Sequence, residues 1–204
     1  MGQNICNVSY THAAGSGQSA GRAARYITQR PEKGQEPTKE SEWEELDYRG
    51  NREQFVSEAG RRRDEKRQIA EQRGVDLQKD KSPSAAAYNH YVLSPERGNE
   101  MSDEHFYKIA REWTHDAGDE EKPHIVAVHR DTEHHHAHVL VADDKMSKSD
   151  ISERKELSEQ VIGEIEQSLD HHRDQQQQQQ EHQQEPARNQ ASQQDQQQDQ
   201  GLEL

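Results

Sequence analysis

The segment from Pro123 to Asp144, PHIVAVHRDTEHHHAHVLVADD, constrains the fold more than any other part of the chain. Two short apolar runs flank a polar turn, and histidines stand at the end of the first run and at the start of the second. Short apolar runs bounded by turn residues are typical of strands, and so short a connection favours an antiparallel hairpin. The segment therefore predicts a hairpin that carries His129, His136 and His138 at the spacing H-x6-H-x-H.

This spacing predicts a set of metal ligands. Side chains alternate faces along a strand, so His134, His136 and His138 point the same way, and the turn brings His129 alongside. Two imidazoles from one strand and a third from its neighbour leave positions open on a divalent cation, as catalytic sites require. Asp131 is predicted to orient one of these imidazoles from outside the ligand set. A solvated histidine-rich loop is the alternative, because an isolated H-x-H is a weak signal.

The composition divides the chain into a folded part and a tail. Apolar residues make up 27% and charged residues 32% of the 204 residues, and from about Asp174 onward the chain is mostly glutamine. Such a tail has too few apolar residues to offset the entropy lost on ordering. We therefore predict one domain over residues 1–170, with 31–84 as a polar insert containing a helix at about 52–72. A Gln-rich disordered or transiently helical tail is expected over 171–204.

The remaining patterns predict an α+β fold, an antiparallel sheet with helices packed on it. Strands are expected at 4–11 and 86–94, in addition to the hairpin. Helices are expected at 20–29, at 52–72 and from Ser102, whose side chain suits an N-cap. A last helix begins after the hairpin, with Ser149 or Asp150 as its cap.

The charge and cysteine content limit the partners and the compartment. A net charge of −14 counts against nucleic-acid binding by the whole surface, although local patches matter more than the sum. Cys6 alone allows no disulfide within the chain and no cysteine-based metal site. We find neither a secretory signal nor a membrane span, which predicts a cytoplasmic protein without a membrane partner. Two basic clusters stand out: an N-terminal arginine cluster (Arg22, Arg25 and Arg30) and a second cluster (Arg61, Arg62, Arg63, Lys66, Arg67 and Arg73).

The second cluster is equally consistent with a solvated helix face. The N-terminal cluster surrounds Tyr26, a candidate nucleophile for a metal-assisted attack on a DNA phosphate. Tyr88 and Tyr91 belong to a predicted strand and Tyr107 to an amphipathic helix, so we interpret them as structural. Tyr26 instead follows a Gly/Ser-rich loop, and its neighbouring arginines can hold the DNA backbone and favour the phenolate.

Three segments resemble a known family. His129, Asp131, His136 and His138 form H-x-D-x4-H-x-H, which resembles the third motif of plasmid mobilisation relaxases in the HUH endonuclease superfamily. Residues 16–30, SGQSAGRAARYITQR, resemble the N-terminal motif of MobA/MobL-type relaxases, in which a tyrosine ends a similar run. The segment YNHYVLSPERGNEMSDEHFYKIAREW resembles the strand and helix that precede the histidine motif. Rolling-circle initiators place the tyrosine after the histidines, whereas this chain has none after Tyr107.

The resemblance covers about residues 1–170 and implies an HUH-endonuclease/relaxase-like fold and a DNA relaxase. Tyr26 would attack the scissile phosphate at a plasmid transfer origin and become linked to the DNA 5′ end. His129, His136 and His138 would bind Mg2+ or Mn2+, and Asp131 would help to activate Tyr26. Implied partners are single-stranded or supercoiled origin DNA, with relaxosome accessory and coupling proteins.

Two alternatives stay open. One is a non-catalytic accessory protein that binds metal or DNA on the same scaffold, and the other is a rolling-circle replication initiator.

Overall fold

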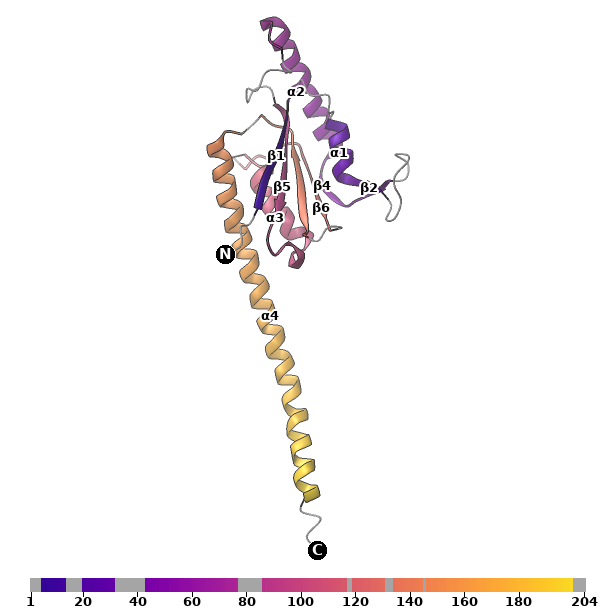
Figure 1. The fold of residues 1–204 in the computed structure, drawn as a ribbon, viewed down its shortest axis with the longest axis vertical. Helices are drawn as coiled ribbons and strands as arrows, with labels where there is room; N and C mark the ends of the chain where they lie inside the picture. Colours follow the sequence, from indigo (N-terminus) through magenta and orange to yellow (C-terminus); the bar gives the residue numbers. More distant parts are fainter. Residues whose placement is uncertain are drawn as a thin grey trace. The chain divides into compact units, whose positions relative to one another are not determined.

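The computed structural model describes residues 5–13, 20–31, 43–76, 86–116, 119–130, 134–144 and 146–199. Side chains are described within 20–29, 46–76, 87–116, 119–130, 134–144 and 146–180. The chain divides into two compact units, Met1–Ile162 and Gly163–Leu204. The predicted sheet and site residues all belong to the first unit (Figure 1).

A five-stranded sheet with antiparallel pairing forms the centre of the first unit. Its strands, in spatial order, are β1 (Ile5–Ala13), β5 (Ala86–Ser94), β7 (His136–Val141), β6 (His124–His129) and β4 (Tyr48–Gly50). The predicted hairpin is present as β6 and β7, and its register runs from His124 opposite Val141 to His129 opposite His136.

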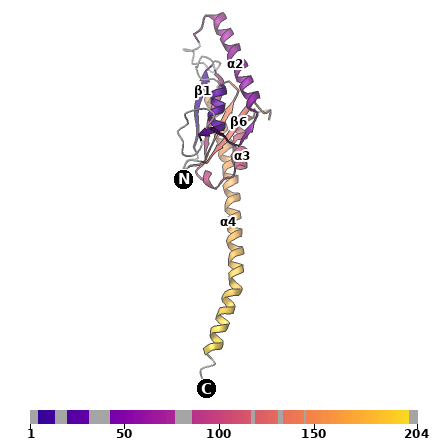
Figure 2. The same cartoon turned by 90° about the vertical axis from the view of Figure 1, so that its right-hand side faces the viewer.

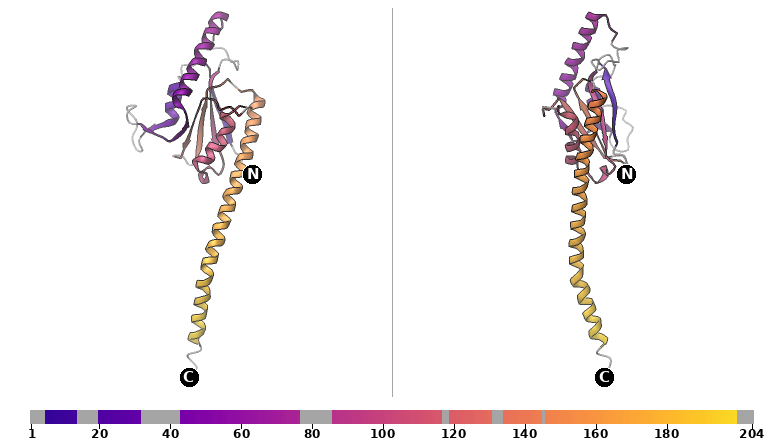
Figure 3. Two further views of the ribbon diagram at one scale, coloured as in Figure 1. Left: turned by 180° about the vertical axis from the view of Figure 1, so that it is seen from behind. Right: turned by 90° about the vertical axis from the view of Figure 1, so that its left-hand side faces the viewer.

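Helices cover both faces of this sheet. α1 (Ala20–Thr28) and α2 (Arg52–Arg73) lie on one face. Figure 2 shows the molecule from the side on which these two helices lie. Their apolar residues, which include Ala24, Ile27 and Phe55, are buried against Ile125 of β6 and Leu140 of β7. α3 (Asp103–Thr114) covers the opposite face, as the views in Figure 3 show. The α+β fold class predicted from the sequence is therefore confirmed.

The cap predicted for the helix at α3 is confirmed. The Ser102 hydroxyl accepts a hydrogen bond from the His105 amide, and the His105 ring accepts one from the Ser102 amide. This reciprocal pair satisfies two amides at the helix start. The buried indole of Trp113 in the last turn of α3 donates to Ser158, at a distance of 2.8 Å. Trp113 therefore fixes α3 against the first turns of the last helix.

The polar segment 31–84 contributes to the sheet and to its core. β4 pairs with β6 at the sheet edge, and α2 buries Phe55, Ala59 and Ala70. A separate two-stranded sheet joins β2 (Gln29–Pro31) to β3 (Trp43–Glu45). These short strands are absent from the sequence-based prediction, because three-residue strands carry too few positions for a periodic pattern.

The last helix, α4, runs from Lys148 to Asp199 and so begins slightly earlier and ends far later than expected. Ser147 caps it in place of Ser149 or Asp150, since its hydroxyl accepts from the Asp150 amide at 3.2 Å. The backbone of the tail is helical as far as Asp199, and the disordered or transiently helical tail expected over 171–204 stays a prediction. Side chains are exposed over 171–180, so helix propensity and not burial accounts for the helix there. The domain boundary near residue 170 stays a prediction.

Substitution of Gly50, in the edge strand β4, is expected to destabilise the protein measurably. Its φ is +102°, and an added Cβ would lie 2.3 Å from the carbonyl oxygen of His124. Strain of this kind costs about 1–3 kcal/mol. We expect Gly50→Ala to lower the free energy of unfolding by at least that amount in a denaturant titration.

The matched control is Gly60→Ala in α2, where an added Cβ meets no atom within 4 Å. Alanine is favoured over glycine in a helix by about 0.5–1 kcal/mol, so this variant should be more stable than the wild type. Equal stability of the two variants would contradict the role assigned to Gly50.

Candidate active site

The predicted ligands stand at the end of the sheet face that α1 and α2 cover. Residues directly opposite in an antiparallel pair share a face. His129 is opposite His136, Ala127 is opposite His138, and Ile125 is opposite Leu140. The alternation therefore continues the buried row of Ile125 and Leu140 into a row of imidazoles where the strands end.

The structure brings His129, His136 and His138 together as predicted. Each offers a ring nitrogen, and these three nitrogens all lie within 4.8 Å of one another. The ring centroids are 5.5 Å apart for His129 and His136, 4.5 Å for His129 and His138, and 5.0 Å for His136 and His138. No other such group of potential metal ligands occurs among the described residues. Three imidazoles converging in this way can hold a divalent cation and leave coordination positions for a substrate.

Two of these rings also contact a backbone carbonyl through one nitrogen. His129 Nε2 lies 2.9 Å from the Ile27 carbonyl oxygen, and His136 Nδ1 lies 3.0 Å from the His134 carbonyl oxygen. A carbonyl oxygen only accepts, so His129 carries its proton on Nε2 and His136 on Nδ1. In this tautomer the lone pair lies on His129 Nδ1 and on His136 Nε2, and a nitrogen with a lone pair is the kind that can bind a metal.

His90 of β5 supplies the corresponding partner for the third ligand. His90 Nε2 lies 2.8 Å from His138 Nδ1, and the two ring centroids are 5.0 Å apart. The sequence does not predict a role for His90, because His90 lies far from the histidine cluster in the chain and no spacing rule connects them. The sequence shows only that His90 belongs to a predicted strand. The pairing of β5 with β7 is what brings His90 to face His138.

Burial keeps His138 in its neutral, metal-binding form. Desolvation, and secondarily the neighbouring His129, His90 and His136, lower the pKa of His138 from its usual 6.5 to about 2. Both causes disfavour a positive charge on the ring. A neutral imidazole is the form that ligates a metal, so this site needs no deprotonation of His138 at neutral pH.

Two histidines of the same segment stay outside the ligand group. His134 precedes β7 and is exposed, so it does not share the strand alternation predicted for it. His135 Nδ1 lies 3.0 Å from the Arg130 guanidinium, which also donates to Asp103 and to the Met101 carbonyl. Arg130 thereby anchors the β6–β7 connection to the start of α3. Asp131, which follows it, lies outside the described residues.

Tyr26 lies beside the histidines. Its ring centroid is 6.5 Å from that of His138, and the rings meet edge to face at 78°. α1 places it there, because Ile27 next to it both packs in the core and accepts the hydrogen bond from His129. Tyr26 is 60% exposed.

The other tyrosines with described side chains are less accessible. Tyr88 and Tyr91 are buried, which agrees with their interpretation as structural, and burial raises the pKa of Tyr88. Tyr48 and Tyr107 are partly buried, and the guanidinium of Arg49 stacks 4.2 Å from the Tyr107 ring centroid. Of these residues, Tyr26 alone combines exposure with a position at the histidines.

The two basic clusters differ in their surroundings. In the N-terminal cluster, Arg22 is exposed and Arg25 is partly buried on α1, whereas the Arg30 side chain lies outside the described residues. In the second cluster, on α2, acidic side chains compensate the charges. Arg61 bonds Glu58 and Glu65 at 2.7 and 3.0 Å, and Arg63 bonds Asp64 at 3.2 Å.

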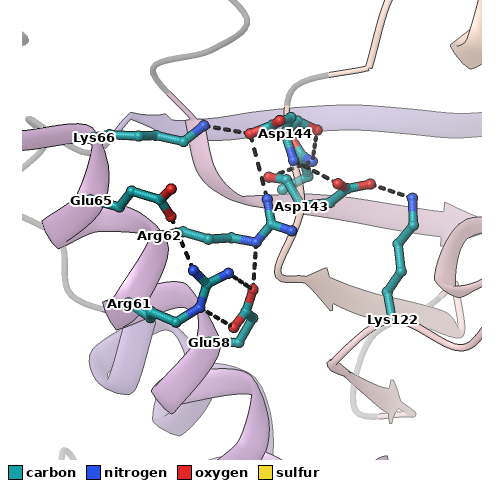
Figure 4. Close-up of polar contacts among 9 residues, drawn as sticks. Glu58, Arg61, Arg62, Glu65, Lys66, Lys122, Asp143 and Asp144 are labelled. Atoms are coloured by element: carbon teal, nitrogen blue, oxygen red, sulfur yellow. Dashed lines mark hydrogen bonds and ion pairs between the residues drawn. The ribbon is translucent and has the colours of Figure 1, made fainter. Parts of the chain in front are cut away.

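Other members of the second cluster connect α2 to the sheet (Figure 4). Lys66 and Arg62 both form ion pairs with Asp144, which follows β7, and Lys122 pairs with the adjacent Asp143. These contacts favour the interpretation of this helix face as a solvated scaffold surface over a DNA-binding surface. The ion pairs also hold α2 beside the strand that carries two of the three candidate ligands.

Comparison with known proteins identifies the family. No curated protein and no solved structure matches the chain. The described helices include none long and apolar enough to cross a membrane. The family model "Relaxase: MobA/VirD2-like, nuclease domain" matches residues 26–171, a range that includes Tyr26, β4 to β7 and all three candidate ligands. Because this match spans most of the chain and agrees with the antiparallel α+β fold, the protein belongs to the MobA/VirD2-like relaxase nuclease family of the HUH superfamily.

Proposed function

We propose that this protein nicks one strand of a plasmid transfer origin and later rejoins it, through a covalent bond between Tyr26 and the DNA 5′ end. The observation that carries the proposal is the position of the Tyr26 ring 6.5 Å from that of His138, beside three converging imidazoles. Membership of the relaxase nuclease family supports DNA nicking as the general reaction. The transfer origin, the role of Tyr26 and the 5′ linkage are the parts that need an experiment.

The donor set suits a divalent metal. His129, His136 and His138 offer three imidazole nitrogens, and each ring also has a polar contact through a ring nitrogen that helps to orient it. Nitrogen ligands bind Mn2+ and later transition metals better than Mg2+, which prefers oxygen. Of the two metals that the family resemblance implies, we therefore propose Mn2+ as the one that the isolated protein binds more tightly. When bound, such a cation would polarise the scissile phosphate and orient it.

The protein's own groups then perform the transfer. Tyr26 Oη forms a bond to phosphorus and loses its proton, while the bond from phosphorus to the 3′ oxygen breaks and that oxygen leaves as a hydroxyl. Rejoining is the reverse attack of the 3′ hydroxyl on the phosphotyrosine. α1 orients Tyr26, and Arg22 and Arg25 on the same helix are proposed to hold neighbouring phosphates. Asp131 and Arg30 stay proposed contributors to activation and to DNA binding.

Incubation of the full chain with supercoiled origin plasmid tests this function. With Mn2+ we expect a nicked product that carries protein on its 5′ end, and mass spectrometry should find the nucleotide adduct on the peptide containing Tyr26. Chelation of the metal should prevent nicking. An adduct on another residue would refute the assignment of Tyr26. Metal binding without nicking of any origin would favour the accessory protein, and a requirement in plasmid replication but not in transfer would favour the initiator.

A further inference from the structure

A groove of about 650 Å³ lies between α1 and α2. Arg22 and Arg25 line it from α1, and Arg52, Glu53 and Ser57 line it from α2. Its volume is within the range of about 300–1,000 Å³ that is usual for ligand sites. The two helices approach closely at two lining residues, where an added Cβ on Gly21 would lie 4.0 Å from Val56.

Arginines outnumber acidic residues in the lining of the groove, although the chain carries a net charge of −14. Three arginines stand against one glutamate among its lining residues. Arg52 and Glu53 are also the first two residues of α2, where backbone amides and the helix dipole favour an anion. One guanidinium group can donate two parallel hydrogen bonds to the oxygens of one phosphate, and a serine hydroxyl can donate one more. These groups together fit a phosphate backbone.

The groove lies next to the candidate nucleophile. Arg25 immediately precedes Tyr26, and Arg22 lies one turn before it on the same helix, about 6 Å along the axis. A DNA strand whose scissile phosphate meets Tyr26 would therefore bring neighbouring phosphates toward Arg22 and Arg25, which line the groove.

We propose that the groove binds the sugar–phosphate backbone of the single strand beside the scissile phosphate, with Arg52 and Ser57 of α2 as contacts additional to those of α1. This inference rests on the proposed function for the position of the scissile phosphate. The affinity of the groove for single-stranded DNA can be measured without cleavage.

The test uses the full chain in EDTA, which prevents metal-dependent cleavage. The probe is a fluorescent oligothymidylate of about 16 nucleotides, the upper site size of a single-strand binding fold. Fluorescence anisotropy across a salt series gives the affinity and the slope of log K against log salt. Loss of one phosphate contact should reduce that slope by about 0.7. We expect this reduction and weaker binding for Arg52→Gln, and tighter binding for Glu53→Gln because it removes a negative charge from the groove.

The matched control is Arg67→Gln, which makes the same charge change at an exposed position about 22 Å further along α2. Equal slopes for Arg52→Gln and Arg67→Gln would overturn the proposal, as would unchanged binding by Glu53→Gln. Thermal unfolding of each variant verifies that it folds. If Arg52→Gln changes the slope while the wild type nicks no origin, the proposal that the groove binds DNA is supported and the proposed function is refuted. If the wild type nicks and Arg52→Gln binds as the control does, only the groove is refuted.

A second inference rests on a different contact, the 2.8 Å approach of His90 Nε2 to His138 Nδ1. His90 is opposite Leu140, two residues from His138 along β7, so it is a diagonal neighbour on the same face. If His90 Nε2 accepts the proton of His138 Nδ1, then His138 Nε2 carries the lone pair needed for a metal. We infer that His90 is a positioning residue that holds His138 in this tautomer.

The test compares two substitutions at one position. The amide of His90→Gln can accept the same hydrogen bond, whereas His90→Leu cannot. Loss of such a partner typically costs about 10–100-fold in metal affinity. We expect that loss of Mn2+ affinity by isothermal titration for His90→Leu, with near wild-type affinity for His90→Gln. His134→Leu is the control, because that variant keeps the backbone carbonyl that His136 uses.

The 15N NMR shifts of the His138 ring in the metal-free protein provide a readout that a purely structural role would not change. In the wild type and in His90→Gln, we expect Nδ1 of His138 to carry the proton. His90→Leu should mix or reverse the tautomer. A protonated Nε2 in the wild type, or wild-type metal affinity in His90→Leu, would overturn the inference.

Discussion

Tyr26→Phe is expected to abolish strand cleavage and adduct formation while metal binding stays at the wild-type level. The change removes only the hydroxyl, so the ring can keep its edge-to-face position 6.5 Å from His138. Loss of the sole nucleophile should lower the single-turnover cleavage rate by at least about 10³-fold. Tyr26 is 60% exposed, so its hydroxyl contributes little to folding and the melting temperature should not change. Gel analysis of nicked plasmid under single-turnover conditions measures the rate.

The control is Tyr107→Phe, which removes the hydroxyl of a partly buried tyrosine that stacks with Arg49 on the far helix α3. That variant should cleave at the wild-type rate. Substantial cleavage by Tyr26→Phe would transfer the nucleophile to another group. Loss of Mn2+ binding in Tyr26→Phe would instead indicate that this residue acts through the metal site.

His136→Ala is expected to remove both metal binding and metal-dependent cleavage. Its ring is one of the three candidate ligands and is only partly buried, so the substitution leaves the core intact. Loss of an oriented partner outside the ligand set costs about 10–100-fold in affinity, and loss of a direct ligand should cost at least the upper value. A metal at 100 times its dissociation constant stabilises a protein by about 2.7 kcal/mol, so thermal unfolding with Mn2+ measures the effect.

The wild type should therefore melt at a higher temperature when Mn2+ is added, and His136→Ala should show no such increase at the same concentration. His134→Ala, an exposed histidine two residues away, should behave as the wild type does. Full Mn2+ stabilisation of His136→Ala would exclude the three-histidine site. Loss of stabilisation in His134→Ala as well would indicate nonspecific binding by the histidine-rich segment.

The sequence alone determined those features that depend on neighbouring residues. Alternation along two short apolar runs predicts the hairpin of β6 and β7 and the shared face of His129, His136 and His138. The Ser102 cap also depends on local geometry, because a hydroxyl three residues before an amide can reach it. The composition of its own segment predicts Tyr26 as the candidate nucleophile, and the structure places its ring beside His138.

Only the tertiary structure decided which distant residues join these features. The pairing of β5 with β7 brings His90 to His138, and the packing of α1 on α2 brings Arg52 to Arg22 and Arg25. Likewise, the acidic partners that neutralise the second basic cluster include Asp144, which lies far along the chain from Lys66. The physical reason is that such contacts depend on strand order and helix packing, which are set by burial of the whole core. A single sequence carries the periodicity of each element, but it does not record which elements become neighbours.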